Sequence, residues 1–293
     1  MVTKADFQLV RSLADKHSRT QHGLFVAEGD KLVGEIIANP EWHIERLFVA
    51  EGSKVISELN SSFAPNATER AHIAEQMQGL RSARNRSLLG ANEDFEHERN
   101  TAVACEICSP KEMERLSALK SAPRSLALVR LPKRKPFVPS AEELIIALDE
   151  VQDPGNLGTI IRTADWYGIR RIVCSPTTAD CFAPKVVQAT MGALLRVEVH
   201  YCDLHEWLGI VRTKGIPTYA TTLDGKDIHT APLSRGGVII MGNEGKGVSP
   251  AVQTMVEHKL FIPPYPADRH GSESLNVAIA TAITCENFRN KKG

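Results

Sequence analysis

Short apolar runs alternate with amphipathic stretches along the second half of the chain. Leu144–Leu148 (LIIAL) and Gly237–Met241 (GVIIM) have the length and composition of buried strands. Leu157, Ile160 and Ile161 fall at the intervals of three and four residues that place side chains on one face of a helix. Strands separated by helices in this way predict an α/β fold with a parallel sheet covered on both faces.

The same two periodicities predict further elements. Strands are expected at Arg171–Cys174 and over residues 217–221 and 259–262, helices near Pro184 and Leu204, and a last helix over about residues 275–288. In the first half, helical spacing at residues 7–13 and 32–37 and a strand at 44–49 again indicate mixed α/β structure.

Changes in composition divide the chain into domains. Residues 60–102 are too polar to build a core and are interpreted as an insertion. Residues 121–142 are basic, contain several prolines and are interpreted as a linker. The prediction is a small N-terminal α/β domain over residues 1–120, which carries the insertion, and a second domain over residues 143–293.

Composition narrows the class of protein. The chain is 42% hydrophobic and 24% charged, and no apolar run approaches the roughly 20 residues that span a bilayer. Without a recognisable targeting segment, we expect a cytoplasmic protein with no membrane contact. Cys105 and Cys108 form a C-x-x-C pair, but a strand there sends the two thiols to opposite faces. Reduced thiols are therefore favoured over a zinc or redox pair, and no metal is expected.

The distribution of charge says more than its sum, which is zero. Six basic residues and no acidic one lie between positions 120 and 135, namely Lys120, Arg124, Arg130, Lys133, Arg134 and Lys135. A second cluster is Arg81, Arg84 and Arg86. Such runs can neutralise the phosphates of a nucleic acid, although a solvated linker face would have the same composition.

The first segment with candidate chemistry covers residues 153–165. A Pro154–Gly155 turn leads into Asn156, which is expected to cap the following helix. Arg162 falls on the helix face opposite the apolar residues. A helix N-terminus suits an anionic group, whereas an arginine on such a face is often only a solvated charge.

Two further segments follow predicted strands. Residues 241–249 hold three glycines in a short loop, which predicts either a close backbone approach or a plain tight turn. Residues 271–277 hold Ser274, an expected helix cap, and Asn276 in the first turn. Neither segment matches G-x-G-x-x-G or a P-loop, so a dinucleotide or triphosphate site is not indicated.

Taken together, the segments N-L-G-T-I-I-R-T-A, M-G-N-E-G-K-G-V-S and S-L-N-V-A-I-A resemble the three motifs of the SpoU (TrmH) family of RNA ribose methyltransferases in the SPOUT superfamily. F-V-A-E-G-D-K-L-V, which begins at Phe25, resembles the substrate-binding domain of that family. The resemblance covers nearly the whole chain except the insertion. It implies a SPOUT domain with a deep trefoil knot and a small RNA-binding domain before it.

The resemblance also implies roles for particular residues. Arg162, Ser274 and Asn276 match catalytic positions, and Asn156 and Glu244 match supporting active-site positions. Main-chain groups at four positions would hold S-adenosylmethionine, namely Thr221, Gly242, Ile262 and Leu275. The family works as a homodimer in which Arg162 of one subunit lies near the cofactor of the other. Residues 264–270 make a longer loop than is usual in the family.

The implied reaction is methyl transfer to a ribose 2′-hydroxyl of structured RNA, with ribosomal RNA favoured over transfer RNA. A 2′-hydroxyl exists only in RNA. The family assigns the arginine at this position as a base, but arginine is a poor base because its pKa is too high. Binding of a phosphate and stabilisation of an oxyanion are therefore further roles that we expect for Arg162. The alternatives are a non-catalytic RNA-binding protein that keeps the fold and, with less support, a nucleotide-dependent dehydrogenase.

Overall fold

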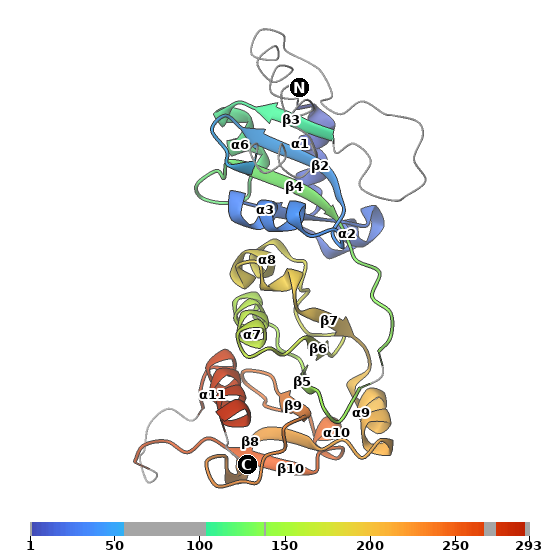
Figure 1. Ribbon diagram of the computed structural model, residues 1–293, viewed down its shortest axis with the longest axis vertical. Coiled ribbons are helices and arrows are strands. Elements are labelled where there is room, and N and C mark those ends of the chain that lie inside the picture. Colours follow the sequence, from blue (N-terminus) through green and yellow to red (C-terminus); the bar gives the residue numbers. More distant parts are fainter. Residues whose placement is uncertain (1, 56–103, 138, 267–273, 291–293) are drawn as a thin grey trace. The chain divides into compact units, whose positions relative to one another are not determined.

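The computed structural model describes residues 2–55, 104–137, 139–266 and 274–290 (Figure 1). The chain forms two compact units, Met1–Lys133 with Phe182–Pro184, and Arg134–Cys181 with Lys185–Gly293. The insertion predicted at residues 60–102 lies outside the described residues.

A four-stranded mixed sheet forms the centre of the first unit, in the order β1-β4-β2-β3. Strand β4 pairs antiparallel with both β1 and β2, whereas β3 pairs parallel with β2. The strands are β1 (Leu24–Glu28), β2 (Ile44–Ala50), β3 (Ala104–Cys108) and β4 (Ser125–Arg130). The predicted strand at residues 44–49 is therefore confirmed as β2.

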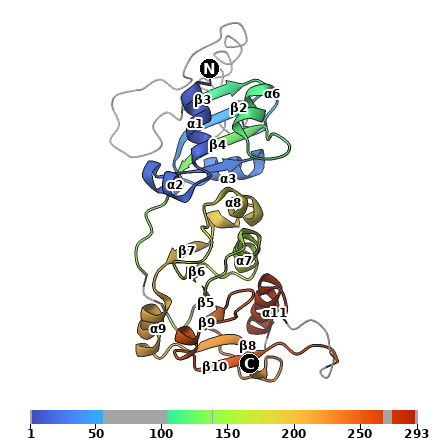
Figure 2. The same cartoon turned by 180° about the vertical axis from the view of Figure 1, so that it is seen from behind.

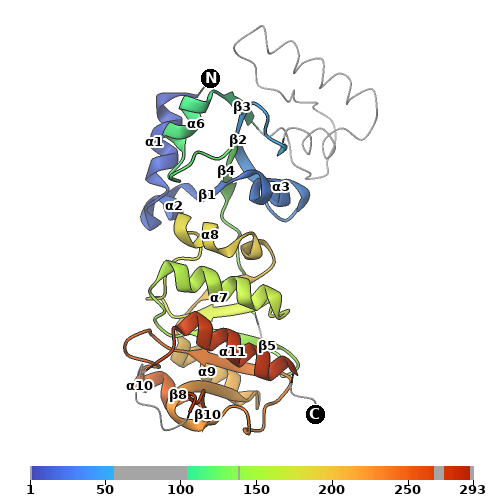
Figure 3. The same cartoon turned by 90° about the vertical axis from the view of Figure 1, so that its left-hand side faces the viewer.

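Helices cover both faces of this sheet (Figure 3). Phe7 and Val10 on α1 (Lys4–Ser12) and Met113 on α6 (Pro110–Leu116) pack with the strands in one apolar cluster. On the opposite face, α3 (Asp30–Ala38) contacts β1 and β4 and buries Val33 and Ile36. A short helix, α2 (Lys16–His22), precedes β1.

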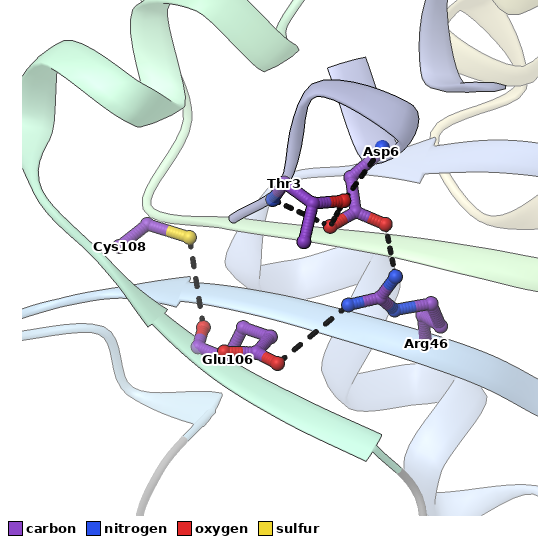
Figure 4. A network of polar contacts seen from close by, with 5 residues as sticks. All are labelled: Thr3, Asp6, Arg46, Glu106 and Cys108. Carbon is purple, nitrogen blue, oxygen red and sulfur yellow. Dashed lines mark hydrogen bonds and ion pairs between the residues drawn. The ribbon is translucent and has the colours of Figure 1, made fainter. Parts of the chain in front are cut away.

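A polar network ties the first helix to this sheet (Figure 4). Thr3 caps α1, since its hydroxyl accepts a hydrogen bond from the Asp6 amide at 3.2 Å and its own amide donates to the Asp6 carboxylate at 2.8 Å. Asp6 also pairs with Arg46 on β2, and Arg46 lies 3.6 Å from the Glu106 carboxylate on β3. The Cys108 thiol donates to the Glu106 carbonyl at 3.6 Å.

The C-x-x-C pair lies on β3, as predicted. Burial raises the pKa of both thiols, Cys105 and Cys108, to about 12. All six cysteines of the chain are free. In the parts of the chain that the structure describes, no group of three or more His, Cys, Asp or Glu side chains could hold a metal ion.

The predicted linker over residues 121–142 is wrong in its first part. Strand β4 lies inside it and occupies an inner position of the sheet. The four residues Leu126 to Val129 are fully buried there. The prolines and basic residues on both sides of this apolar run have the composition of a linker. The strand itself lacks an alternating polar pattern because both of its faces are buried, and so it was not recognised.

The second part of that segment is held by the second unit. The Phe137 ring lies 4.9 Å from the guanidinium carbon of Arg171 and 4.8 Å from the centre of the His200 ring. Arg134 lies 3.7 Å from the Glu198 carboxylate. Phe137 and Arg134 therefore attach this part of the segment to the second unit.

A six-stranded sheet forms the centre of the second unit, in the order β10-β8-β9-β5-β6-β7, with every neighbouring pair parallel. This confirms the predicted parallel sheet. The strands are β5 (Leu144–Leu148), β6 (Arg171–Cys174), β7 (Glu198–Tyr201), β8 (Thr218–Asp227), β9 (Gly237–Met241) and β10 (His258–Phe261). Strand β8 runs beyond the predicted end at residue 221 because its second half pairs with β10.

Helices lie on both faces of the second sheet (Figure 2). On one face, Trp207 and Leu208 of α9 (Leu204–Thr213) pack on Ile145 and Ala147, beside α10 (Pro250–Gln253). On the other face, α7 (Pro154–Trp166) and α11 (Val277–Asn290) lie side by side. Two short helices, α8 (Pro184–Thr190) and η1 (Ala193–Leu195), follow β6. No described helix is both long and apolar enough to cross a membrane.

Candidate active site

The predicted site residues gather at the carboxyl ends of parallel strands. Strands β10, β8, β9 and β5 are neighbours, so the segments that follow them meet at one edge of the sheet. Gly242 follows β9, Ile262 follows β10, and Thr221 lies one residue past the last pairing of β8 with β9. Ligands of parallel α/β sheets bind at this edge.

Helix α7 begins at this edge, and its cap differs from the prediction. Asp153 is the N-cap, and its carboxylate accepts a hydrogen bond from the Asn156 amide at 2.8 Å. Pro154 takes the first helical position. Asp and Asn cap helices about equally well, so the sequence alone did not separate the two candidates. Because Asp153 supplies the cap, the side chain of Asn156 is available for other contacts.

The side chain of Asn156 joins two other segments. Its Nδ2 donates to Glu244 Oε1 at 3.0 Å, and its Oδ1 accepts from Nδ2 of Asn276 at 2.9 Å. Glu244 also lies 3.3 Å from the Asp153 amide and 3.5 Å from that of Gln152. Asn156 therefore directly contacts one predicted site residue from each of the other two motifs.

Helix α11 also has a different cap from the one predicted. Asn276 Oδ1 accepts hydrogen bonds from the amides of Ala278 at 2.9 Å and Ile279 at 3.3 Å, so Asn276 is the cap. Ser274, the predicted cap, is exposed and lies two residues earlier. Both residue types are good caps. The helix starts at Val277, which leaves Ser274 outside its first turn.

The glycine-rich loop after β9 closes on itself. The main chains of Asn243 and Gly247 exchange two hydrogen bonds of 2.9 Å. A β-carbon on Gly242 would lie 2.1 Å from the carbonyl carbon of Gly247 and 2.2 Å from the amide nitrogen of Val248. Glycine is therefore required at position 242 by the approach of the loop's own backbone.

The loop between β5 and α7 contains a strained residue that the sequence did not reveal. Glu150 has φ of +62°, a conformation that costs a non-glycine residue about 1–3 kcal/mol. Its amide donates to Ser175 Oγ at 2.9 Å, and its carbonyl accepts from Asn243 Nδ2 at 2.8 Å. No local pattern marks a glutamate for this conformation, whereas Asn243 stands inside a motif that the sequence had singled out.

Arg162 lies further along α7. Six residues separate it from Asn156, which corresponds to about 9 Å along a helix axis. It is exposed, and its side chain makes no hydrogen bond or ion pair with any other described residue. Leu157, Ile160 and Ile161 are buried, as predicted for the opposite face. Within one chain, the structure therefore does not join Arg162 to the Asn156 contacts.

The four predicted cofactor positions fit a ligand that is held by main-chain groups. Thr221, Gly242 and Ile262 follow or end three neighbouring strands, and Leu275 directly precedes the cap of α11. Among the described residues, the main chains of Gly242 and Leu275 have no hydrogen-bond partner. The Thr221 hydroxyl donates to Sδ of Met241 at 3.4 Å, which fixes its side chain to β9.

Comparison with known proteins connects this edge to a family. The model of the SpoU rRNA Methylase family matches residues 143–286, and that of the MRM3-like substrate binding domain matches residues 6–85. The 23S rRNA (guanosine(2553)-2′-O)-methyltransferase RlmP of Bacillus subtilis is 32% identical over 190 residues, which cover 64% of this chain and 74% of that protein. The chain belongs to the SpoU rRNA methylase family. This confirms the resemblance drawn from the three motifs.

Solved structures of RNA methyltransferases match all or nearly all of the chain. A protein from Porphyromonas gingivalis described as an RNA methyltransferase of the TrmH family is 32% identical with a TM-score of 0.74, and the match covers 100% of both chains. The AdoMet-bound rRNA methyltransferase of Sinorhizobium meliloti is 26% identical with a TM-score of 0.74, covering 99% of this chain and 95% of that one. As a SpoU methylase, this protein is an RNA 2′-O-methyltransferase that uses S-adenosylmethionine.

Proposed function

We propose that this SpoU methylase methylates a ribose 2′-hydroxyl of ribosomal RNA. The observation that carries the proposal is the contact of Asn156 with both Glu244 and Asn276, which assembles one residue of each motif at the carboxyl edge of the sheet. The names of relatives that act on 23S rRNA, such as that of Bacillus subtilis, support ribosomal over transfer RNA.

The main chain of Thr221, Gly242, Ile262 and Leu275 holds S-adenosylmethionine in this proposal. When bound, the cofactor supplies a methyl group that is activated by its sulfonium. Asn276 uses its Oδ1 to cap α11 and one N–H to bind Asn156, so its role is to position Asn156. A fixed orientation of the acceptor hydroxyl can account for several orders of magnitude in rate.

Arg162 and exposed Ser274 are proposed to contact the RNA. A guanidinium is almost never neutral in a protein, so a role as general base is disfavoured. Arg162 has no competing partner among the described residues and can bind a phosphate beside the target ribose. From there it also stabilises negative charge that develops on the 2′-oxygen. Ser274 can donate a hydrogen bond to the same backbone.

The catalytic unit is proposed to work as a homodimer with a trefoil knot. Trp166 lies one turn beyond Arg162 on α7 and is 85% exposed, and Ile279 on the neighbouring helix α11 is 52% exposed. Large exposed apolar side chains of this kind favour association with a second copy, which would bring Arg162 to the partner's cofactor. Helix α11, which follows edge strand β10 in the sequence, packs beside α7, and this placement supports the proposed knot.

The first unit is proposed to bind structured RNA. Three of the six basic residues between positions 120 and 135 already have partners: Arg124 donates to the Gly52 carbonyl at 3.0 Å, Arg130 pairs with Glu45 and Arg134 with Glu198. Lys120 and Lys133 of this unit are exposed, as is Lys135 just beyond it in the second unit, which supports phosphate contacts by these lysines first. An RNA substrate and six free cysteines support a cytoplasmic location.

Calorimetric titration of the full-length protein with S-adenosylmethionine, with and without ribosomal RNA, tests the enzyme against a non-catalytic RNA-binding protein. The proposal predicts saturable binding of the cofactor in both cases. Binding of RNA without any binding of the cofactor would support the non-catalytic alternative instead.

A further inference from the structure

The side chain of Asn243 extends from the glycine-rich loop to the loop after β5. Its Nδ2 donates to the Glu150 carbonyl at 2.8 Å. Its Oδ1 accepts from the amides of Gly245 and Lys246, both at 3.0 Å. The two amides fix which end of the side chain faces its own loop, so the NH₂ group must face Glu150.

Glu150 is held from two sides in a conformation that it would not adopt alone. Its φ of +62° lies in the left-handed region, which a side chain with a β-carbon disfavours. Ser175 accepts from its amide at 2.9 Å while Asn243 binds its carbonyl. Three residues later Asp153 caps α7, so the backbone direction at Glu150 sets where that helix begins.

The next residue of the glycine-rich loop, Glu244, binds the same segment between β5 and α7. Glu244 faces the amides of Gln152 and Asp153 and the side chain of Asn156. Asn243 and Glu244, which are neighbours in the glycine-rich loop, therefore both bind the segment between β5 and α7. We expect these contacts to determine the position of Asn156 and of Arg162 on the same helix.

We propose that Asn243 is a positioning residue for methyl transfer. It holds Glu150 in its left-handed conformation and so fixes α7 against the glycine-rich loop. This inference deepens the proposed function and rests on it. Asn243 touches neither substrate nor cofactor in this account. Its loss should therefore lower kcat through misplacement of α7, while binding of the cofactor is preserved.

Asn243→Asp isolates the donated hydrogen bond. Aspartate keeps an acceptor for the amides of Gly245 and Lys246 but cannot donate to Glu150. We expect kcat to fall about ten- to a hundredfold, as for a small misplacement of a reacting group. The dissociation constant for S-adenosylmethionine should stay within about threefold of that of the unsubstituted protein. A lower kcat with unchanged cofactor affinity distinguishes a positioning role from a role in binding.

Substitution of Glu150 provides the rescue. Glu150→Gly in the Asn243→Asp background removes the penalty of the left-handed conformation, since glycine adopts it freely. Glu150→Ala removes the same carboxylate but keeps the β-carbon, and it is the matched control. We expect the glycine to restore kcat to within about threefold of the unsubstituted protein, and the alanine to restore none.

Hydrogen exchange of the peptide over residues 150–156 provides a readout that does not need activity. Exchange should be faster in Asn243→Asp and should slow again with Glu150→Gly but not with Glu150→Ala. Ser175→Ala, which removes the other partner of Glu150, should give the same pattern if Asn243→Asp fails to fold. Unchanged kcat and exchange in Asn243→Asp, or equal rescue by alanine and glycine, would overturn the proposal. If the unsubstituted protein methylates no RNA but the variants show the expected differences in hydrogen exchange, only the proposed function is contradicted.

Discussion

The side-chain amide of Asn156 donates to Glu244 Oε1 at 3.0 Å, although 88 positions separate the two residues in sequence. The same amide accepts from Asn276, which is 120 positions away. One side chain on the first turn of α7 therefore fixes the glycine-rich loop on one side and the cap of α11 on the other.

Asn156→Asp should place a carboxylate against that of Glu244. The bond from Asn276 is kept, but the donated bond becomes a repulsion between like charges. We expect kcat for methyl transfer to fall at least about tenfold, because the two loops are pushed apart. Steady-state kinetics with labelled S-adenosylmethionine would measure this.

The double variant Asn156→Asp with Glu244→Gln is the control for charge. Glutamine can donate to the new aspartate, so activity should partly return. A double variant no more active than the single one would show that the Asn156–Glu244 hydrogen bond does not determine the rate.

Arg162→Ala should reduce methyl transfer by about two orders of magnitude or more, the range seen when a group that stabilises developing charge is removed. Affinity for S-adenosylmethionine should be nearly unchanged, because Arg162 does not belong to the proposed cofactor positions. Arg212 on α9 is also exposed and lies on the other face of the sheet, so Arg212→Ala is a matched control. Near-normal turnover in Arg162→Ala would remove Arg162 from the mechanism.

Gly242→Ala should weaken both the loop and cofactor binding. Its β-carbon would meet the backbone of Gly247 and Val248 at 2.1–2.4 Å, and overpacking of this kind costs about 1–3 kcal/mol. Gly245→Ala is the control, since its β-carbon would have only Asn243 Oδ1 nearby, at 3.7 Å. Thermal denaturation alongside cofactor titration should show a lower Tm and weaker binding for Gly242→Ala alone. Equal behaviour of the two variants would contradict the steric explanation.

A fragment that begins at Arg134 should fold, bind S-adenosylmethionine and methylate RNA poorly. The catalytic unit starts there, and Phe137 packs on Arg171 and His200 of that unit. A fragment that begins at residue 121 keeps β4 without its sheet and exposes an apolar strand, so it should aggregate more. Size-exclusion chromatography would compare them. Full activity of the shorter fragment on RNA would show that the first unit is not needed for the substrate.

The sequence predicted best what local patterns determine. Strands β5, β6 and β9 begin and end where predicted, because each contains a continuous apolar run that is bounded by charged residues, serine or glycine. The caps were misassigned because Asp153 and Asn156 offer the same local chemistry, and tertiary contacts decide between them. Strand β4 was hidden by its neighbouring prolines, and its place in the sheet depends on pairing with strands about 80 to 100 positions earlier. The left-handed Glu150 accepts a hydrogen bond from Asn243, which is 93 positions away, so no local pattern can indicate this contact.

Transfer of tritium from labelled S-adenosylmethionine to ribosomal RNA, followed by nucleoside analysis of the product, tests the central claim most directly. RNA from a strain that lacks this protein provides an unmethylated substrate. We predict one 2′-O-methylated nucleoside, formed by the unsubstituted protein and not by Arg162→Ala. A methyl group on a base, or no transfer by a protein that binds both S-adenosylmethionine and the RNA, would contradict the account.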